Sequence, residues 1–357
     1  MDMNEILKEF NLSYKAKNFG NGHINETFVV KGDPKHTVQK INTYVFKNPD
    51  QLMENIDAVT THLRKKIIEN GGDPKRETLC VVKTKDGKNY FRDGDDCYRC
   101  YVFVDDVYAV EENATLDDMR EAGYAYGKFM NMLADFPADK LHETIVDFHD
   151  TVKRYNNFEN SVNADKAGRA SSVAEEIKFV KDRKDYASVV VNAMAEGKIP
   201  LKVTHNDTKL NNILFDEKTK KGLCVIDLDT VMPGSALYDF GDALRFAGST
   251  GAEDEKDLSK IEFDLEKFKM FTKGFISSAK DSLNELEIEL LPFAVILMTY
   301  ECGMRFLTDY LDGDVYFRTH CENHNLDRCR TQFKLIADME AKKQQMQDIV
   351  KEIVNEF

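Results

Sequence analysis

The spacing of apolar and polar residues divides the chain into a strand-rich first part and a helix-rich remainder. Up to about residue 104, short apolar runs with a two-residue period alternate with turns rich in glycine and asparagine, as in antiparallel strands. One helical pattern, at 49–66, interrupts these runs and begins at Pro49, a residue that suits a first helical turn. We therefore expect a small five-stranded antiparallel sheet with one helix.

Beyond residue 105, apolar residues recur mainly at the helical spacing of three and four. Helices are expected, among other places, at 115–134, 170–196 and 328–357, and the segment 138–160 is rich in polar residues, with Phe148, Tyr155 and Phe158 among them. In the first of these, Gly123 and Gly127 stand four residues apart and permit close packing of a second helix. The predicted fold class is α+β, with an N-terminal lobe (1–104) and a larger, mostly helical C-terminal lobe (105–357).

Composition narrows the classes of function. The 357 residues, 42% of them hydrophobic, are enough for two compact units. The net charge of −14 argues against nucleic acid as a partner, because proteins that bind the phosphate backbone carry basic surfaces. The longest apolar run, 290–298, contains Pro292 and is too short to span a bilayer, so no membrane partner is expected.

The N-terminus and the cysteines indicate a cellular location. The first residues are acidic where a signal peptide is basic, and an odd number of cysteines, seven, does not suggest a disulfide framework. We expect reduced thiols in the cytoplasm, and a chain that is a monomer or a weak homo-oligomer.

One stretch concentrates the candidate chemistry: Thr204-His205-Asn206-Asp207-Thr208-Lys209-Leu210-Asn211-Asn212. It is followed, after a polar turn, by Ile226-Asp227-Leu228-Asp229, and the apolar runs on either side of that turn predict a hairpin. The order H-x-D-x-K-x-x-N, with an aspartate after the hairpin, is typical of the catalytic loop of a kinase.

In phosphoryl transfer these residue types have defined roles. Asp207 would receive the proton of the substrate hydroxyl, and Lys209 would approach the γ-phosphate as charge develops there. Asn212 and Asp227 offer the oxygen ligands that Mg²⁺ prefers. Each residue alone is more often part of a capped turn or an exposed surface, but five matched types in order favour catalysis.

Upstream, a glycine turn offers a site for the phosphates of ATP. In Gly20-Asn21-Gly22-His23-Ile24-Asn25 the backbone N–H groups can approach an anion. The candidate nucleotide contacts here are Gly20, Asn21, Gly22, His23 and Asn25. Asn25 stands where a third glycine is usual, and a plain hairpin is the alternative.

Two further segments are candidates for contact with the nucleotide. The strand expected at 37–42 carries Lys40 where kinases have a lysine for the α- and β-phosphates, and Gln39, on the opposite face, is the alternative. Glu54 or Asp57 on the next helix would be its acidic partner. At the end of the lobe, the backbone of Val102 and Val104 is expected to contact adenine, as in a kinase hinge.

Two residues are expected to support the catalytic loop or the core. His149 lies among aromatic residues, where a hydrogen-bonded structural role is more common than a catalytic one. An acidic residue in Leu237-Tyr238-Asp239-Phe240-Gly241-Asp242 is expected to fix the loop by accepting hydrogen bonds from its backbone or from His205.

Taken together, the glycine turn, the 205–212 run and the 226–229 segment resemble the aminoglycoside phosphotransferase superfamily, small-molecule relatives of the protein kinases. The resemblance implies their bilobal fold, ATP and Mg²⁺ as cofactors, Asp207 as general base, and Asn212 and Asp227 as metal ligands. Segments 20–27, 204–214 and 301–307 are similar to the branch that phosphorylates the anomeric hydroxyl of N-acetylglucosamine or N-acetylgalactosamine. That similarity implies a sugar pocket formed, besides Asp207, by Asp229, Phe246, Arg305 and Tyr316.

Other functions remain open at this point. The same superfamily includes kinases of choline, homoserine and aminoglycosides, and a catalytically silent nucleotide-binding module is a further alternative. The absence of tryptophan makes a cage for the quaternary ammonium of choline less favourable. Arg305, in turn, could form an ion pair with Glu301 or Asp309 on its own helix rather than bind a sugar.

Overall fold

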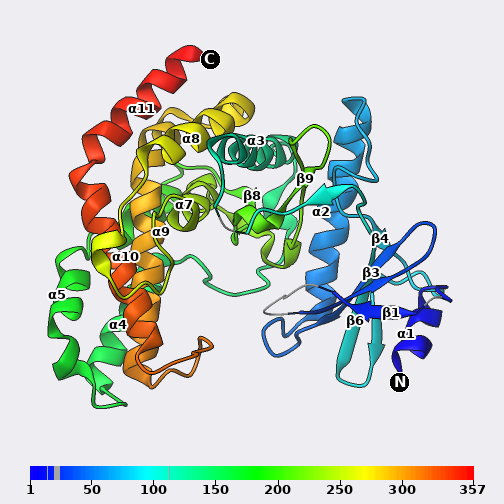
Figure 1. The fold of residues 1–357 in the computed structure, drawn as a ribbon, viewed down its shortest axis with the longest axis horizontal. Coiled ribbons are helices and arrows are strands. Elements are labelled where there is room, and N and C mark those ends of the chain that lie inside the picture. Colours follow the sequence, from blue (N-terminus) through cyan, green and yellow to red (C-terminus); the bar gives the residue numbers. More distant parts are fainter. Residues whose placement is uncertain (14, 20–24, 112) are drawn as a thin grey trace.

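The computed structural model describes residues 1–13, 15–19, 25–111 and 113–357 and contains the two expected parts (Figure 1). The first part, here called the N-lobe, has helices α1 (Met3–Glu9) and α2 (Pro49–Glu69) and one antiparallel sheet. The strands of this sheet are β1 (Ala16–Asn18), β2 (Glu26–Val30), β3 (His36–Ile41), β4 (Val81–Val82), β5 (Phe91–Asp93) and β6 (Asp96–Val102). The rest of the chain, the C-lobe, is mostly helical.

The N-lobe sheet has six strands, one more than expected. The strand order is β1-β2-β3-β6-β4, and β5 also pairs with β6. Strand β4 pairs with Cys100 and Tyr101, whereas β5 pairs with the beginning of β6, at 96–98. Two short strands therefore share one edge of β6, and the sheet is at most five strands wide.

The two faces of this sheet belong to different cores. On one face, Val38 and Cys100 pack with the apolar side of α1. On the other face, Cys97 and Tyr101 join the large core that continues through α2 into the C-lobe. The sheet is thus covered on both sides, and the face toward the C-lobe is the one that can contribute to a site between the lobes.

We propose to place the boundary between the lobes at 104/105, because the chain changes its strand partners there. Strand β6 ends in the N-lobe sheet, and the next strand, β7 (Val107–Tyr108), pairs with β9 (Ile213–Asp216) of the C-lobe. Arg76 spans this junction: its guanidinium donates to the carbonyl of Asp105 and lies 3.1 Å from the Asp216 carboxylate.

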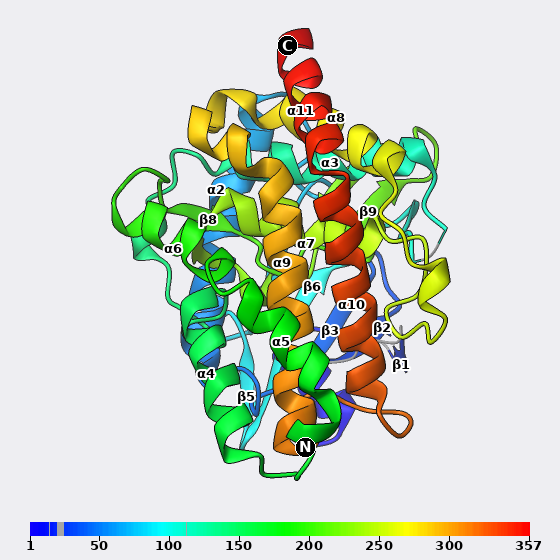
Figure 2. The same cartoon turned by 90° about the vertical axis from the view of Figure 1, so that its left-hand side faces the viewer.

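The C-lobe surrounds a long central helix, α9 (Figure 2). Its helices are α3 (Leu116–Met132), α4 (Thr151–Ala164), α5 (Ala174–Asp182), α6 (Tyr186–Ala195), α7 (Ala236–Ala247), α8 (Leu265–Ala279), α9 (Glu285–Asp312), α10 (His324–Ala341) and α11 (Lys343–Glu356). Between α6 and α7 lie the short strands β8 (Lys202–Thr204), β9, β10 (Gly222–Val225) and β11 (Met232–Gly234). These strands carry the catalytic stretch.

The polar-rich segment 138–160 is α-helical only in its second part. Its first regular turn starts at Thr151, because the Asp150 side chain accepts a hydrogen bond from the Lys153 N–H and caps the helix there. Most of the preceding segment is irregular and lies next to the catalytic loop.

The helices expected at 170–196 and 328–357 are each divided in two. The breaks fall at Arg183, between α5 and α6, and at Lys342, between α10 and α11. At each break a long cationic side chain turns to acceptors elsewhere: Arg183 binds Glu340, and the Lys342 ammonium donates to the Phe263 carbonyl at 2.9 Å. Periodicity alone does not show such breaks.

Helices α3 and α8 pack closely, as the glycine spacing predicted. A Cβ atom on Gly123 would lie 2.1 Å from the Phe271 carbonyl oxygen, and one on Gly274 would lie 1.9 Å from that of Arg120. Only glycine allows the two backbones to approach so closely. This contact fixes α3 beside the catalytic loop.

Helix α9 has the length and apolar composition of a membrane span, but 78% of its most apolar window is buried in the protein. A capping box of Asn284 and Glu287 begins it, and Gly313, at φ 99°, ends it. A helix that is apolar on most sides is expected at the centre of a helical lobe.

Candidate active site

The catalytic stretch lies between β8 and the hairpin of β9 and β10. The chain turns sharply at Asn206 (φ 64°) and again at Asp227 (φ 59°), and both residue types tolerate this left-handed backbone conformation. The two turns bring 205–212 and 226–230 together, since the Ile226 N–H donates to the Asn212 carbonyl at 2.9 Å. The predicted meeting of the two motifs is therefore confirmed.

Asp239, on α7, fixes the first turn of the catalytic loop. Its buried carboxylate accepts hydrogen bonds from the N–H groups of His205 (2.8 Å) and Asn206 (2.7 Å). Its carbonyl accepts another from the Thr208 hydroxyl (2.7 Å). Burial raises the pKa of Asp239, although His205 and the two N–H groups act in the opposite direction. The expectation that an acidic residue of 237–242 holds this loop is confirmed.

Asp207 and Lys209 form an ion pair at the end of the loop. The Lys209 ammonium lies 2.7 Å from one carboxylate oxygen of Asp207 and 3.0 Å from the other. Burial acts to raise the pKa of Asp207, but the charge of Lys209 outweighs it, so the pKa is lowered. Asp207 is thus ionised at neutral pH, the state that a general base requires.

Tyr126, on α3, holds the backbone of Lys209. Its hydroxyl accepts from the Lys209 N–H (2.9 Å) and donates to the Lys209 carbonyl (2.6 Å). Burial opposes the charge of Lys209, but Asp207 raises the pKa of the ammonium above its usual value. The cation beside the proposed base is therefore permanent at neutral pH.

Asn212 and Asp227 stand on adjacent turns, as a shared cation would require. The Asn212 amide nitrogen donates to the Asp207 carbonyl (2.8 Å), which leaves the amide oxygen as the atom that can bind a cation. Part of the Asp227 residue is exposed to solvent. The protein around its carboxylate removes some of its hydration, and this loss, together with the negative charges of Asp229 and Asp207, raises the pKa of Asp227 to about 6. A carboxylate crowded in this way favours a compensating cation.

The donors present fit a divalent cation that shares its coordination with phosphate. Among the described residues, no group of three or more His, Cys, Asp and Glu side chains could hold a metal ion by itself. One carboxylate and one amide oxygen are the protein ligands expected when Mg²⁺ is bound together with a nucleotide.

His149 connects the catalytic loop to α9. Its Nε2 lies 3.0 Å from the Asn206 carbonyl oxygen, and its Nδ1 lies 3.0 Å from a carboxylate oxygen of Glu301. Burial acts to lower the pKa of His149, but Glu301 outweighs it and the pKa is raised. Because both partners are acceptors, the protonated ring satisfies them both. The structural role expected for His149 is confirmed.

The glycine turn is only partly described. Four of the predicted nucleotide contacts lie outside the described residues: Gly20, Asn21, Gly22 and His23. The fifth, Asn25, is buried; its amide donates to the Asp229 carboxylate (2.6 Å), and its amide oxygen accepts from the Asn42 N–H (2.9 Å). Asn25 therefore joins the end of the turn to the C-lobe.

Lys40 lies on the face of the sheet that packs against α1, away from the catalytic loop. It pairs with Tyr98 across the strands, and its ammonium lies 2.9 Å from Asp96. Gln39 points to the other face, where it accepts a hydrogen bond from Nε of Arg99 (3.0 Å). The strand period thus places the alternative residue, Gln39, on the side of the site. The two candidate acidic partners bind elsewhere, Glu54 to His142 and Asp57 to Lys83.

The segment expected to contact adenine is fixed to the N-lobe. The Val102 N–H donates to the Cys80 carbonyl, and the Phe103 N–H donates to that of Lys35, both at 2.9 Å. The side chain of Val104 is buried. Since the Val102 N–H is already used, a contact of Val102 with adenine would have to use its carbonyl, and the role of both valines stays a prediction.

Arg305 and Tyr316 lie together, as the predicted substrate pocket requires. The centre of the Arg305 guanidinium is 5.8 Å from the ring centroid of Tyr316 and 5.5 Å from those of Phe148 and Phe317. It also lies 3.6 Å from Glu301, so the ion pair considered as an alternative is present. Tyr316 is 65% exposed, which leaves this aromatic enclosure accessible from one side.

The other two residues predicted for that pocket are placed differently. The Asp229 carboxylate is buried, and its oxygens already bind Arg99 and Asn25 of the N-lobe. Phe246, near the end of α7, is 45% exposed. Among the described residues, neither takes part in the ring contacts around Arg305.

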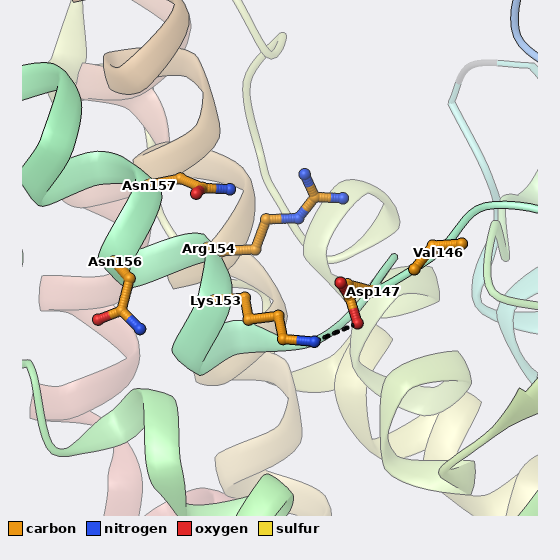
Figure 3. A pocket seen from close by; sticks show the side chains of 6 residues that line it. All are labelled: Val146, Asp147, Lys153, Arg154, Asn156 and Asn157. Carbon is orange, nitrogen blue, oxygen red and sulfur yellow. Dashed lines mark hydrogen bonds and ion pairs between the residues drawn. The ribbon is translucent and has the colours of Figure 1, made fainter.

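A pocket of about 240 Å³ opens on the side of α4 that carries Arg154 (Figure 3). Its lining residues are Val146, Asp147, Lys153, Arg154, Asn156 and Asn157, none of which belongs to the catalytic loop. Lys153 reaches back to Asp147 at 2.6 Å. Arg154 and Arg305 contact the same residue: the Arg154 guanidinium donates to the Phe148 carbonyl (2.8 Å), and the Arg305 guanidinium lies 5.5 Å from the Phe148 ring centroid. Burial, and then the positive charge of Arg305, lower the pKa of Arg154.

Two residues with a place in this site, Tyr126 and Arg99, were missed by sequence reasoning, and a third, Glu301, entered only as a possible partner of Arg305. Tyr126 and Glu301 lie on helices whose partners, Lys209 and His149, are distant in sequence, and no local pattern marks these contacts. Arg99 had a signal: it alternates with Cys97 and Tyr101 on a strand face that is otherwise apolar. A charge at such a position requires a buried partner.

The comparison with protein families agrees with this geometry. The model described as the phosphotransferase enzyme family matches residues 15–269. The chain belongs to this family. The matched region contains the N-lobe sheet and both catalytic motifs, so the chain is a phosphotransferase and its catalytic stretch lies within the part that the family shares.

Solved structures with the same fold include small-molecule kinases. The chain is similar to a microcompartment-associated aminopropanol kinase (17% identity, TM-score 0.66, covering 96% of this chain and 97% of that one). It is also similar to an aminoglycoside phosphotransferase from Alicyclobacillus acidocaldarius (13%, 0.62, 100% and 97%) and to the amicoumacin kinase hAmiN (13%, 0.61, 96% and 94%). At these identities the likeness shows the fold, a sheet-rich N-terminal part and a helical C-terminal part, as predicted.

Proposed function

We propose that the chain is an ATP-dependent kinase that phosphorylates the anomeric hydroxyl of N-acetylglucosamine or N-acetylgalactosamine to give the sugar 1-phosphate. The observation that carries this proposal is the arrangement around Arg305, whose guanidinium lies among three aromatic rings, one of them that of Phe148, whose carbonyl binds Arg154. Aromatic faces suit the apolar side of a sugar ring, and guanidinium groups donate to hydroxyl or acetamido oxygens. Two neighbouring arginines oppose an ammonium group at the same place.

ATP and Mg²⁺ are the cofactors that fit this site. The solved hAmiN structure holds AMP-PNP and Ca²⁺, and the streptomycin complex of another aminoglycoside phosphotransferase holds ATP. In this chain, Asn212 and Asp227 would hold Mg²⁺ together with the phosphates, which Mg²⁺ would neutralise during transfer. The glycine turn and the segment at 102–104 would bind the rest of the nucleotide.

Asp207 and Lys209 would then perform the transfer. Asp207 accepts the proton of the attacking hydroxyl, and an anomeric hydroxyl is acidic enough for a carboxylate with a lowered pKa to serve. Lys209, now paired with Asp207, is placed to turn to the γ-phosphate as negative charge develops on it. The change of partner would release Asp207 as the substrate arrives.

The deciding experiment is a coupled assay of ADP release with a panel of acceptors. It would compare N-acetylglucosamine, N-acetylgalactosamine, glucose, galactose, choline, homoserine, 1-aminopropan-2-ol and kanamycin, with the phosphorylated atom located by NMR. We expect the highest kcat/KM with an N-acetylhexosamine and phosphate on O1. Highest kcat/KM on an amine, or phosphate on O6, would refute the sugar assignment and leave the phosphotransferase family intact.

Arg305→Ala tests the residue that carries the proposal. Loss of a charged hydrogen bond to the sugar should raise the KM for sugar by about tenfold or more, while the KM for ATP stays within about twofold. Arg330→Ala, on α10, is the matched control, because Arg330 forms an exposed pair with Glu176. Equal effects on both KM values would assign Arg305 a structural role with Glu301.

An amino-alcohol kinase is the second candidate. Proteins of the same fold are named as aminopropanol, ethanolamine and choline kinases. The acceptor panel separates the two candidates directly.

A cytoplasmic location and a monomeric or weakly associated state are also proposed; the seven cysteines are free, as expected of a reducing compartment.

A further inference from the structure

Arg99 is a fully buried arginine at the junction of the lobes. It lies on β6 with 1% of its surface exposed, and its Nε donates to the Gln39 amide oxygen at 3.0 Å. Its Nη1 pairs with one carboxylate oxygen of Asp229, and Asn25 donates to the other. Two side chains of the N-lobe therefore hold one carboxylate of the C-lobe.

The strand register explains why the cation comes from β6. Gln39 of β3 stands opposite Arg99, on the face toward the C-lobe, and the charged residue of β3, Lys40, points to the other face. Other pairs between the lobes are partly exposed, for example Arg76–Asp216. Arg99 and Asp229 are 1% and 4% exposed, so water does not screen their interaction.

The pair is connected to the proposed metal site through a short turn. Asp229 lies two residues after Asp227, in the turn that the structure also holds from the C-lobe. There the Thr144 hydroxyl donates to the Asp229 carbonyl (3.1 Å), and the Thr230 hydroxyl donates to the His205 carbonyl (2.7 Å). The side chain of Asp229 is held from the N-lobe.

We propose that Arg99 is a positioning residue for this reaction: by fixing Asp229 it orients Asp227 and links the N-lobe to the binding of the metal–nucleotide complex. The inference rests on the proposed role of Asp227 as a magnesium ligand, and not on the identity of the sugar. Groups that orient a metal ligand typically change metal affinity by about 10- to 100-fold when removed.

The test measures ADP binding to the full chain by calorimetry, with and without Mg²⁺ and without any sugar. In Arg99→Met we expect the gain in ADP affinity from Mg²⁺ to fall by about tenfold or more, while metal-free binding changes by less than about threefold. Arg92→Met is the control, because Arg92 is an exposed residue of the same sheet and its guanidinium donates to the Tyr90 hydroxyl. It should keep the full magnesium gain.

A second set of variants separates positioning from stability. Arg99→Met leaves the Asp229 carboxylate buried without its cation, so the double variant with Asp229→Asn removes that charge and should recover most of the Tm. We expect the recovered protein still to lack the gain in ADP affinity from Mg²⁺. Gln39→Leu removes the acceptor of Arg99 Nε but keeps the charge of Arg99, and it should lose part of that gain.

Two results would overturn the inference. A full magnesium gain in Arg99→Met or in the recovered double variant would reduce Arg99 to a structural role and would leave the proposed function untouched. Absence of any magnesium gain in the wild-type chain would instead refute the metal assignment of Asp227, and the inference with it. The sugar assignment is tested only by the acceptor panel.

Discussion

The catalytic loop and the loop that follows α9 both carry residues with proposed roles, but the protein holds them in different ways. The catalytic loop, 204–212, is fixed from several elements: by Asp239 of α7, Tyr126 of α3, and His149 in the segment before α4. Each of these side chains binds a backbone group of the loop. The positions of Asp207 and Lys209 are therefore determined several times over.

The loop after α9 is held mainly near its start, where the Asp309 carboxylate binds its backbone and the Asp314 carboxylate binds Arg169 and Asn325. Asp309, buried on α9, accepts hydrogen bonds from the N–H groups of Val315 (2.9 Å), Tyr316 (2.7 Å) and Phe317 (2.9 Å). Val315 and Tyr316 are 75% and 65% exposed. The two loops differ in support: the backbone of the catalytic loop is held from three elements, and the proposed substrate contacts stand on a more exposed loop that is held near one end.

The largest effect is expected from Asp207, at the rigid end of this comparison. Asp207→Ala should lower kcat by about 10²- to 10⁴-fold, because a positioned base is lost, while ADP still binds. Turnover and ADP affinity would be measured on the same preparation, with Asp117→Asn as the control, since Asp117 is exposed at the start of α3. Normal kcat in Asp207→Ala would exclude Asp207 as the base.

Asp239 tests whether the frame itself matters for rate. Asp239→Ala leaves two buried N–H groups without an acceptor, at a cost of about 1–3 kcal/mol each in the free energy of unfolding. We expect a lower Tm together with a fall in kcat of about tenfold or more, because Asp207 loses its fixed position. A lower Tm with unchanged kcat would show that Asp207 keeps its position without the hydrogen bonds of Asp239.

Much of this frame was accessible from sequence, and the reason is local. His205, Asp207 and Asn212 lie within one loop, so their spacing alone places them together, and Asp239 follows within a short distance along the chain. Strand periodicity likewise offered Gln39 and Lys40 as residues of opposite faces. The choice between them needed the register with β6, which sequence alone does not give.

What sequence did not give depends on contacts between distant elements. Asp229 was predicted to contact sugar, but Arg99, 130 positions away, occupies its carboxylate. At the helix breaks, Arg183 and Lys342 likewise bind acceptors on other elements. Arg305 and Tyr316, which the family resemblance assigned to one pocket, do lie together, since both are near the C-terminal end of α9. The anchor of that loop, Asp309, entered only as a possible ion-pair partner.

Asp309→Asn addresses the less constrained loop. The amide keeps one oxygen as an acceptor. Its NH₂ group, however, would face the donors that bind the second carboxylate oxygen in the wild-type protein, and these hydrogen bonds would be lost. We expect the KM for the sugar to rise about three- to tenfold, with kcat and the KM for ATP nearly unchanged, since the loop that carries Tyr316 and Phe317 is disturbed and the catalytic loop is not. Glu322→Gln, exposed in the same segment, is the control. A fall in kcat as large as the rise in KM would contradict the separation of the two loops.

The smallest effect is a pH dependence at the point where the rigid frame meets α9. The raised pKa of His149 favours the folded state below its ordinary value of 6.5, and this contribution is lost as pH rises through the raised pKa. Burial opposes ionisation of Glu301, but His149 outweighs it and lowers its pKa below 4.5, so that contribution is present above 4.5 and is lost as pH falls through the lowered pKa. The pair therefore stabilises the folded state most between pH 4.5 and 6.5, the two ordinary pKa values.

His149→Gln should lower the Tm in this pH range by about 2 °C, for a loss of about 1 kcal/mol, and by less above the raised pKa, where the wild-type ring also becomes neutral. Thermal unfolding of both proteins from pH 5 to 9 measures this, and a difference that does not shrink at high pH would mean that His149 stabilises the loop without its charge.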